Sequence, residues 1–113
     1  MEFKIINEMK NINEIDIKSN NKLQVIFKHS TTCSVSFFIK KSILNEMVNF
    51  EGSEFDIYYL DLLAFRNISN AISSYYSVKH ESPQILIIEN GKCIYNASHS
   101  EVSLEIDLLT LAN

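Results

Sequence analysis

A cysteine in a polar segment is the residue of this sequence best suited to covalent chemistry. Cys33 lies within residues 30–36, after an apolar run typical of a β-strand and before a run with helical spacing. The first turn of a helix presents free backbone N–H groups and the positive end of the helix dipole, and both favour an anion. Such a position lowers the pKa of a thiol and raises the fraction present as thiolate, the form that attacks disulfides. The segment therefore predicts a reactive thiol rather than a buried, inert cysteine.

The residue three positions after Cys33 decides how many thiols take part. A second cysteine there would resolve a mixed disulfide, but the sequence has Ser36. Ser36 falls one turn after Cys33 on the same helix face, so its hydroxyl either donates to the thiolate or is that of an ordinary helix serine. The spacing indicates a one-thiol site in which Cys33 forms the covalent bond.

Length and composition limit the classes of function. A chain of 113 residues is long enough for one core, and ten basic against fourteen acidic residues give a net charge of -4. Nucleic-acid binding needs a basic surface, and a transmembrane helix needs a run of roughly 20 apolar residues. The sequence has neither, and residues 1–8 lack the apolar core of a signal peptide. Two cysteines are too few for a disulfide framework, and a reactive thiol needs a reducing compartment. We expect a cytoplasmic protein with no nucleic-acid or membrane partner.

The order of the predicted strands indicates an α/β fold. Apolar and β-branched runs predict strands at about residues 22–28, 54–60, 84–89 and 92–96. The first is apolar nearly throughout, which is typical of a central strand covered on both faces. A strand–helix–strand crossover makes the first two strands parallel, whereas the turn signal Asn90-Gly91 makes the last two an antiparallel hairpin.

Helical spacing predicts four helices around these strands. The first bears Met9, Ile12 and Ile15 on one face after an Asn7 cap, and others cover residues 66–77 and 100–111. The helix that follows Cys33 extends to about residue 50, and we expect Thr31 or Thr32 to cap it.

Two segments resemble a known family. They are Phe-Lys-His-Ser-Thr-Thr-Cys-Ser-Val-Ser at 27–36 and His-Glu-Ser-Pro-Gln at 80–84. Together they resemble the monothiol bacilliredoxin family, and the resemblance runs from about residue 5 to the C-terminus. It implies that residues 1–113 form a single thioredoxin-like domain, with a central four-stranded mixed sheet flanked by helices. It also implies a cis Ser82–Pro83 bond facing Cys33. Ser34 departs from the family, where proline is common; it offers an extra N–H near the thiolate but less rigidity.

The resemblance also implies an activity. The Cys33 thiolate of a monothiol thiol–disulfide oxidoreductase would attack a mixed disulfide between a client protein and a low-molecular-weight thiol. The client leaves reduced, and Cys33 carries the small thiol until another thiol removes it. In the family this small thiol is bacillithiol, a co-substrate rather than a bound cofactor. The implied partners are therefore S-thiolated client proteins and the small thiol.

Six residues besides Cys33 and Ser36 are candidate substrate contacts: Thr32, Ser34, Ser82, Pro83, Lys28 and His29. The cis proline would expose the backbone of Ser82 for pairing with a thiol-bearing substrate. Lys28 and His29 either supply positive charge to a thiolate or carboxylated ligand, or are a solvated lysine and a strand-end histidine. His80 offers the same two interpretations. No histidine has metal-ligand spacing with a cysteine, so we expect no metal site.

The second cysteine, Cys93, is a candidate resolving thiol that the topology argues against. It follows the predicted hairpin turn, so a whole strand separates it from Pro83, a distance on the order of 15 Å. A disulfide needs Cα atoms within about 7 Å. If Pro83 faces Cys33, Cys93 is a strand packing residue.

Two other functions remain open. A thioredoxin-fold binding or redox-sensing module would use the same groove between Thr32 and Pro83 without turnover. An arsenate-reductase-like enzyme would need an arginine for its oxyanion, and the sequence's one arginine, Arg66, lies outside the cysteine segment. The second of these is the least favoured.

Overall fold

The core of the protein is a mixed β-sheet of five strands. The computed structural model describes residues 2–50, 52, 54–104 and 108. The strands are β1 (Lys4–Ile5), β2 (Leu23–His29), β3 (Phe55–Asp61), β4 (Gln84–Glu89) and β5 (Lys92–Ser98). Their order across the sheet is β1-β3-β2-β4-β5. All four predicted strands are present. The sheet also contains a fifth strand that the sequence did not predict, the short edge strand β1, which pairs in parallel with β3.

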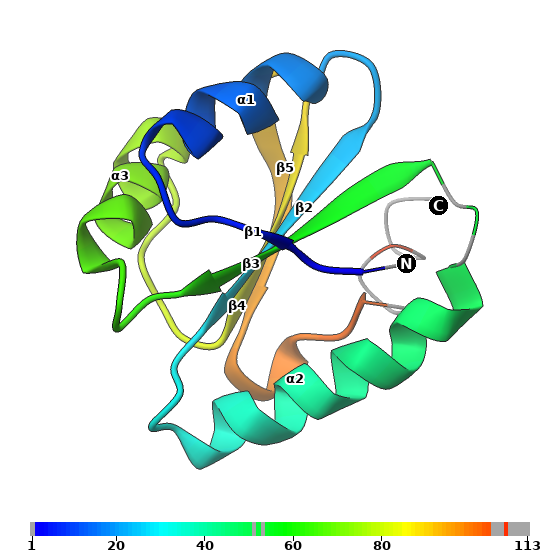
Figure 1. Ribbon diagram of the computed structural model, residues 1–113, viewed down its shortest axis with the longest axis vertical. Helices are drawn as coiled ribbons and strands as arrows, with labels where there is room; N and C mark the ends of the chain where they lie inside the picture. The colour runs from blue at the N-terminus through cyan, green and yellow to red at the C-terminus, as the bar shows by residue number, and fades with distance from the viewer. Residues whose placement is uncertain (1, 51, 53, 105–107, 109–113) are drawn as a thin grey trace.

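Helices cover both faces of the sheet. They are α1 (Lys10–Lys18), α2 (Ser34–Met47) and α3 (Arg66–Tyr76), with short 3₁₀ turns η1 (Val48–Phe50) and η2 (His99–Glu101). Figure 1 shows α1 and α3 on one face of the sheet and α2 on the other. Half of the residues of the predicted helix over 100–111 lie outside the described residues. Within the described part, residues 100 and 101 belong to η2 and Val102 and Ser103 are not helical, so the predicted start at residue 100 is wrong. In the part of the chain that the structure describes, no helix is both long and apolar enough to span a membrane.

The strands alternate their side chains between two apolar clusters, because successive residues of a strand point to opposite faces. Ile26 of β2 packs in the cluster with α1 and α3, whereas Val25 and Phe27 pack in the cluster with α2. All three are at most 1% exposed. β2 is therefore the buried central strand that its apolar sequence predicts.

The register of β2 brings two distant segments to one end of the sheet. β2 runs parallel to β3 and antiparallel to β4, with Lys28 paired to Gln84. Pro83, one residue earlier, therefore lies beside the carboxyl end of β2, from which the chain continues to Cys33. Figure 1 shows the β2–α2 and α3–β4 connections at this same end.

Local turn chemistry sets the opposite end of the hairpin. Asn90 and Gly91 both have positive φ, at 50° and 75°, as a two-residue hairpin turn requires.

The predicted helix caps are less accurate than the predicted turn. α1 begins after Met9, and the Asn11 side chain accepts the N–H groups of Asn7 and Glu8. Asn7 is therefore not the capping residue.

Candidate active site

Cys33 lies at the N-terminus of α2. It is the N-cap residue, with φ -99° and ψ 122°, and no side chain caps the helix, so the predicted Thr31 or Thr32 cap is wrong. Its N–H bonds to the Ser30 carbonyl at 3.2 Å, and its own carbonyl accepts the N–H of Phe37 at 3.0 Å. The thiol is free and half-buried. Cys33 therefore lies where the free backbone N–H groups and the positive end of the dipole of this 14-residue helix are found.

The residues that flank Cys33 leave it accessible. Thr32 and Ser34 are both exposed, and the Thr32 hydroxyl lies 3.3 Å from that of Ser30. A polar, solvent-facing turn on either side of the thiol gives an incoming disulfide a route to the sulfur. Their roles as substrate contacts stay predictions.

Ser36 is fully buried one turn into α2. Its Oγ accepts the backbone N–H of Ser30 at 3.3 Å, which links the helix to the loop before Cys33. A hydroxyl that accepts one bond still has its own proton to donate. Ser36 therefore shapes the cysteine loop, and donation to the thiolate stays a prediction.

The Ser82–Pro83 peptide bond is cis, as the resemblance implies. Pro83 is buried, and its carbonyl accepts the N–H of His99 at 2.8 Å, which ties the start of β4 to the end of β5. The Ser82 hydroxyl oxygen is buried without a hydrogen-bond partner among the described residues.

Lys28 lies on the face of the sheet that α3 covers. It is fully buried, and its ammonium donates to the Ser69 carbonyl at 3.0 Å and the Ser73 hydroxyl at 2.9 Å. It also lies 3.5 Å from Nδ1 of His80. Burial lowers the pKa of Lys28 from 10.5 to about 8. The two motif segments thus meet through Lys28 and His80, beneath α3 rather than beside α2.

His29 points to the opposite face, toward α2. It is 4% exposed, and its ring packs near those of Phe27 and Tyr59, with centroids 5.8 and 5.6 Å away. Burial and then the Lys40 ammonium lower its pKa below 6.5, only partly offset by Asp61 and the Ser36 backbone. A lowered pKa disfavours the charged imidazole, which argues against the interpretation that His29 supplies positive charge. Its role as a substrate contact stays a prediction.

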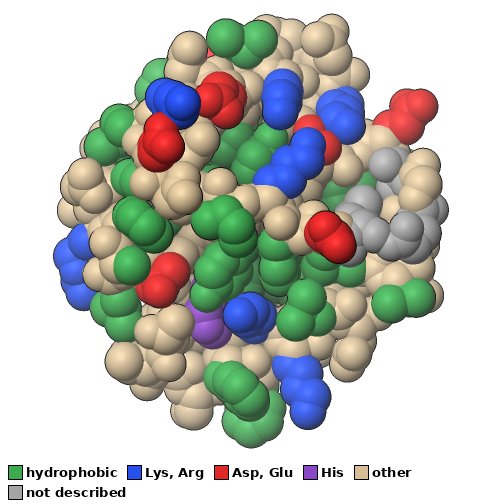
Figure 2. Space-filling view, in the orientation of Figure 1, with side chains coloured by type: hydrophobic (Ala, Val, Ile, Leu, Met, Phe, Trp, Pro, Cys, Tyr) green, Lys and Arg blue, Asp and Glu red, His purple; other side chains and the backbone are tan. Residues whose placement is uncertain are grey.

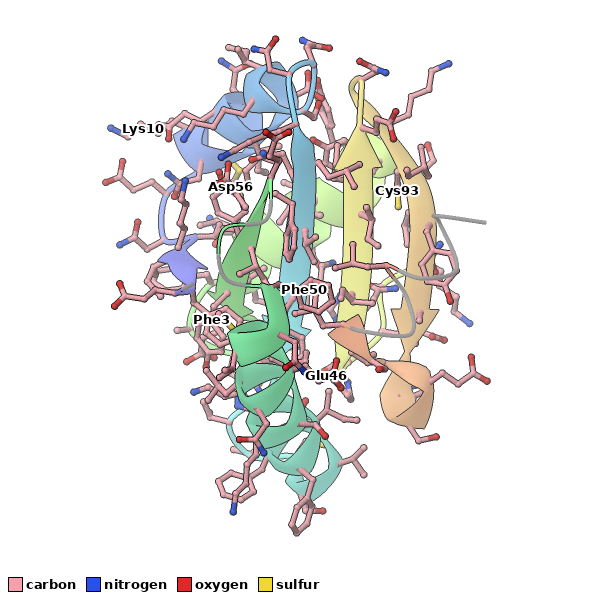
Figure 3. All side chains as sticks on the ribbon, turned by 90° about the vertical axis from the view of Figure 1, so that its right-hand side faces the viewer. Phe3, Lys10, Glu46, Phe50, Asp56 and Cys93 are labelled. Carbon is pink, nitrogen blue, oxygen red and sulfur yellow. The ribbon has the colours of Figure 1, made fainter. Side chains whose placement is uncertain are left out.

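Cys93 lies at the far end of the sheet. It pairs with Ile88 near the hairpin turn, whereas Ser98 at the other end of β5 pairs with Gln84, next to Pro83. Its thiol donates to the Tyr95 carbonyl at 3.2 Å, and burial raises its pKa. Figure 3 shows the labelled Cys93 away from the N-terminal half of α2. The placement agrees with a packing role.

Sequence reasoning missed several partners of the motif. Ser69 and Ser73 of α3 hold Lys28, and Lys40 of α2 and Asp61 of β3 flank His29. None of these lies in the two motif segments, so only the strand alternation of Lys28 and His29 could have hinted that they have different partners.

Solved structures with a similar architecture are thioredoxin-fold proteins. A protein described as a candidate oxidoreductase with a thioredoxin fold superposes with a TM-score of 0.82 at 25% identity, covering 96% of this chain and 92% of that one. Thioredoxin of Malassezia sympodialis gives 0.75 at 15% identity, with 97% and 90% covered. Fasciola hepatica thioredoxin gives 0.71 at 15% identity, with 98% and 100% covered. The fold and the cysteine at the start of α2 define a thioredoxin-fold redox protein.

The family is narrower than the fold. The family model for the monothiol bacilliredoxin BrxC matches residues 4–106. The chain belongs to the monothiol bacilliredoxin family.

Proposed function

We propose that this protein removes a low-molecular-weight thiol, bacillithiol, from mixed disulfides on client proteins. The observation that carries the proposal is the isolation of one accessible thiol, Cys33, at the start of α2, with Cys93 at the other end of the sheet. A thioredoxin-fold site with two nearby thiols would form an internal disulfide. One thiol can only exchange with an external partner.

The reaction balances with Cys33 alone. Its thiolate attacks the sulfur of the small thiol, a new disulfide forms, and the bond to the client sulfur breaks. The client sulfur leaves with the electron pair and takes a proton from solvent. A second external thiol then attacks the adduct and releases Cys33. The N-terminal N–H groups of α2 stabilise the thiolate at the start and end of this cycle.

The segment around the cis Ser82–Pro83 bond supports the proposal that a client protein binds beside Cys33. It lies at the sheet end from which the chain leads to Cys33, and Ser82 offers a backbone and a hydroxyl oxygen without a partner among the described residues. An extended client segment can pair with such a backbone. Two free thiols also suit a reducing compartment, so we place the protein in the cytoplasm.

Intact-mass analysis tests the activity directly. The protein is incubated with a peptide that carries bacillithiol on its cysteine, and with the same peptide carrying glutathione. We expect the reduced peptide to appear together with a bacillithiol adduct on Cys33, and Cys33→Ser to give neither. An inert Cys33 would contradict the proposal and favour a binding or sensing module, and equal transfer from both peptides would contradict the choice of small thiol.

A further inference from the structure

The protein buries a lysine that the proposed exchange reaction does not use. Figure 2 shows lysine and arginine side chains, in blue, spread over the surface of one face, the usual place for a charged side chain. Lys28 is instead fully buried under α3, on the face of the sheet opposite α2 and Cys33. Any effect of Lys28 on exchange at Cys33 must therefore pass through the residues that it contacts.

The ammonium of Lys28 has three protons, and three acceptors lie within reach of it. Two are on α3, the Ser69 carbonyl at 3.0 Å and the Ser73 hydroxyl at 2.9 Å. The third is Nδ1 of His80 at 3.5 Å, which also lies 3.2 Å from the Ser69 hydroxyl. Because an ammonium can only donate, His80 fits this arrangement with Nδ1 unprotonated and its proton on Nε2.

A second buried side chain holds the same loop. Gln84 of β4 pairs with Lys28 of β2, and directly opposed residues of an antiparallel pair project to the same face. Gln84 is 1% exposed, and its Nε2 donates to the Lys79 carbonyl at 2.9 Å. Two adjacent residues of the loop, Lys79 and His80, are thus each bound by a side chain from one of two neighbouring strands.

The loop held in this way leads directly into the cis bond. His80 precedes Pro83 by three positions, and the Ser82–Pro83 bond is cis. In the proposed reaction an extended client segment pairs with the backbone of Ser82. A backbone that is already ordered loses less conformational entropy when a client binds. The contacts of His80 therefore bear on how well a client docks, whereas the thiol chemistry takes place at Cys33.

A proton on His80 disrupts this arrangement. Protonation of Nδ1 removes an acceptor and places a second positive charge beside the Lys28 ammonium, 3.5 Å away. Burial is the main cause that lowers the pKa of His80 below 6.5, and the charges of Lys28 and Arg66 add to it. The neighbouring Glu81 acts in the opposite direction. The contact is therefore intact near neutral pH and is lost at more acidic pH.

We propose that Lys28 is a positioning residue for client binding, which acts through neutral His80 to hold the backbone before Pro83. The inference rests on the proposed exchange reaction and adds the residues that prepare its client-binding segment. Lys28 touches neither the client nor the reacting sulfurs. Such a role accounts for a buried ammonium that has no carboxylate partner among the described residues, an arrangement that by itself costs stability.

Two disulfides that leave the same adduct separate client docking from thiol chemistry. One is a neutral, blocked peptide linked to bacillithiol, and the other is the symmetrical disulfide of bacillithiol, which has no extended peptide segment. Adduct formation on Cys33 is timed by intact mass, and the ratio of the two rates cancels changes in the Cys33 thiolate. We expect Lys28→Met and His80→Leu to lower this ratio roughly tenfold near neutral pH, about the effect of one hydrogen bond. His80→Asn, whose amide oxygen can replace Nδ1 as the acceptor, should bring the ratio back toward the wild-type value.

The pH profile distinguishes this role from a purely structural one. The wild-type ratio should fall between about pH 7 and pH 5, whereas the His80→Asn ratio should not, because an amide does not titrate. Lys92→Met, at an exposed position on β5, is the control and should follow the wild type at each pH. An unchanged ratio in Lys28→Met, or parallel pH profiles of the wild type and His80→Asn, would overturn the proposal. A wild-type Cys33 that gains no adduct from either disulfide would instead refute the exchange reaction itself.

Discussion

Replacing Lys28 by methionine is expected to stabilise the protein at neutral pH. Lys28 is fully buried, and its contacts among the described residues are with Ser69, Ser73 and His80, none of which carries a carboxylate. Its pKa is lowered by burial from 10.5 to about 8, which corresponds to roughly 3 kcal/mol at about 1.4 kcal/mol per pKa unit. Methionine removes this cost but also removes the hydrogen bonds, so we expect a gain of about 1–3 kcal/mol at pH 7.

The pH dependence isolates this effect. Below pH 8 the lysine is charged in both the folded and unfolded states, and the folded state carries the whole cost of burial. As the pH rises toward 10.5 the folded state releases the proton first, so the wild type becomes more stable relative to Lys28→Met. The difference in unfolding free energy should shrink by roughly 2–3 kcal/mol between pH 7 and pH 10.

Urea unfolding of both proteins at several pH values, under reducing conditions, measures the difference. Lys92→Met, at an exposed position on β5, is the matched control and should show no such pH dependence. A difference between the wild type and Lys28→Met that stays constant from pH 7 to pH 10 would refute the reasoning. So would a large destabilisation by methionine at pH 7, since the ammonium would then be net stabilising.

Two further predictions concern the helix and the opposite end of the sheet. Ser36→Cys should let an internal thiol expel the adduct and shorten the life of the loaded protein, whereas Ser36→Ala should slow exchange and loosen the loop at Ser30. Mass spectrometry over time distinguishes these outcomes, and an adduct equally long-lived in Ser36→Cys would contradict the first. Burial raises the pKa of Asp56, but hydrogen bonds from Lys4, Gln24 and Lys22 outweigh it and lower the pKa to about 2. The wild type should therefore lose about 2 kcal/mol relative to Asp56→Asn as the pH falls from 5 to 2, which acid unfolding measures; parallel curves would contradict it.

Local sequence signals predicted the parts of the fold that depend on neighbouring residues. The Asn90-Gly91 turn needs only positive φ at two positions, and the apolar run of β2 needs only burial on both faces. Strand β1 could not be predicted in this way, because its two residues are too few to show the alternation of side chains that is typical of a strand. The cap of α2 was mispredicted because the chain enters the helix in an extended conformation at Cys33 itself, without a side-chain cap.

The sequence predicted which motif residues form the candidate site, but not which residues of other elements contact them. The motif identified Cys33 and Pro83, and antiparallel pairing of β2 with β4 brings their segments to one end of the sheet. The opposite directions of Lys28 and His29 follow from strand alternation. Their partners on α2 and α3 depend on how those helices pack, which spacing within the motif does not reveal.

The central claim is that one thiol carries the exchange. The most direct measurement is adduct formation from a bacillithiol-carrying peptide by Cys93→Ser and by Cys33→Ser, followed by intact mass. The account predicts that Cys93→Ser forms the adduct at the wild-type rate and that Cys33→Ser forms none. Loss of exchange in Cys93→Ser comparable to that in Cys33→Ser would contradict it and require a mechanism with two cysteines.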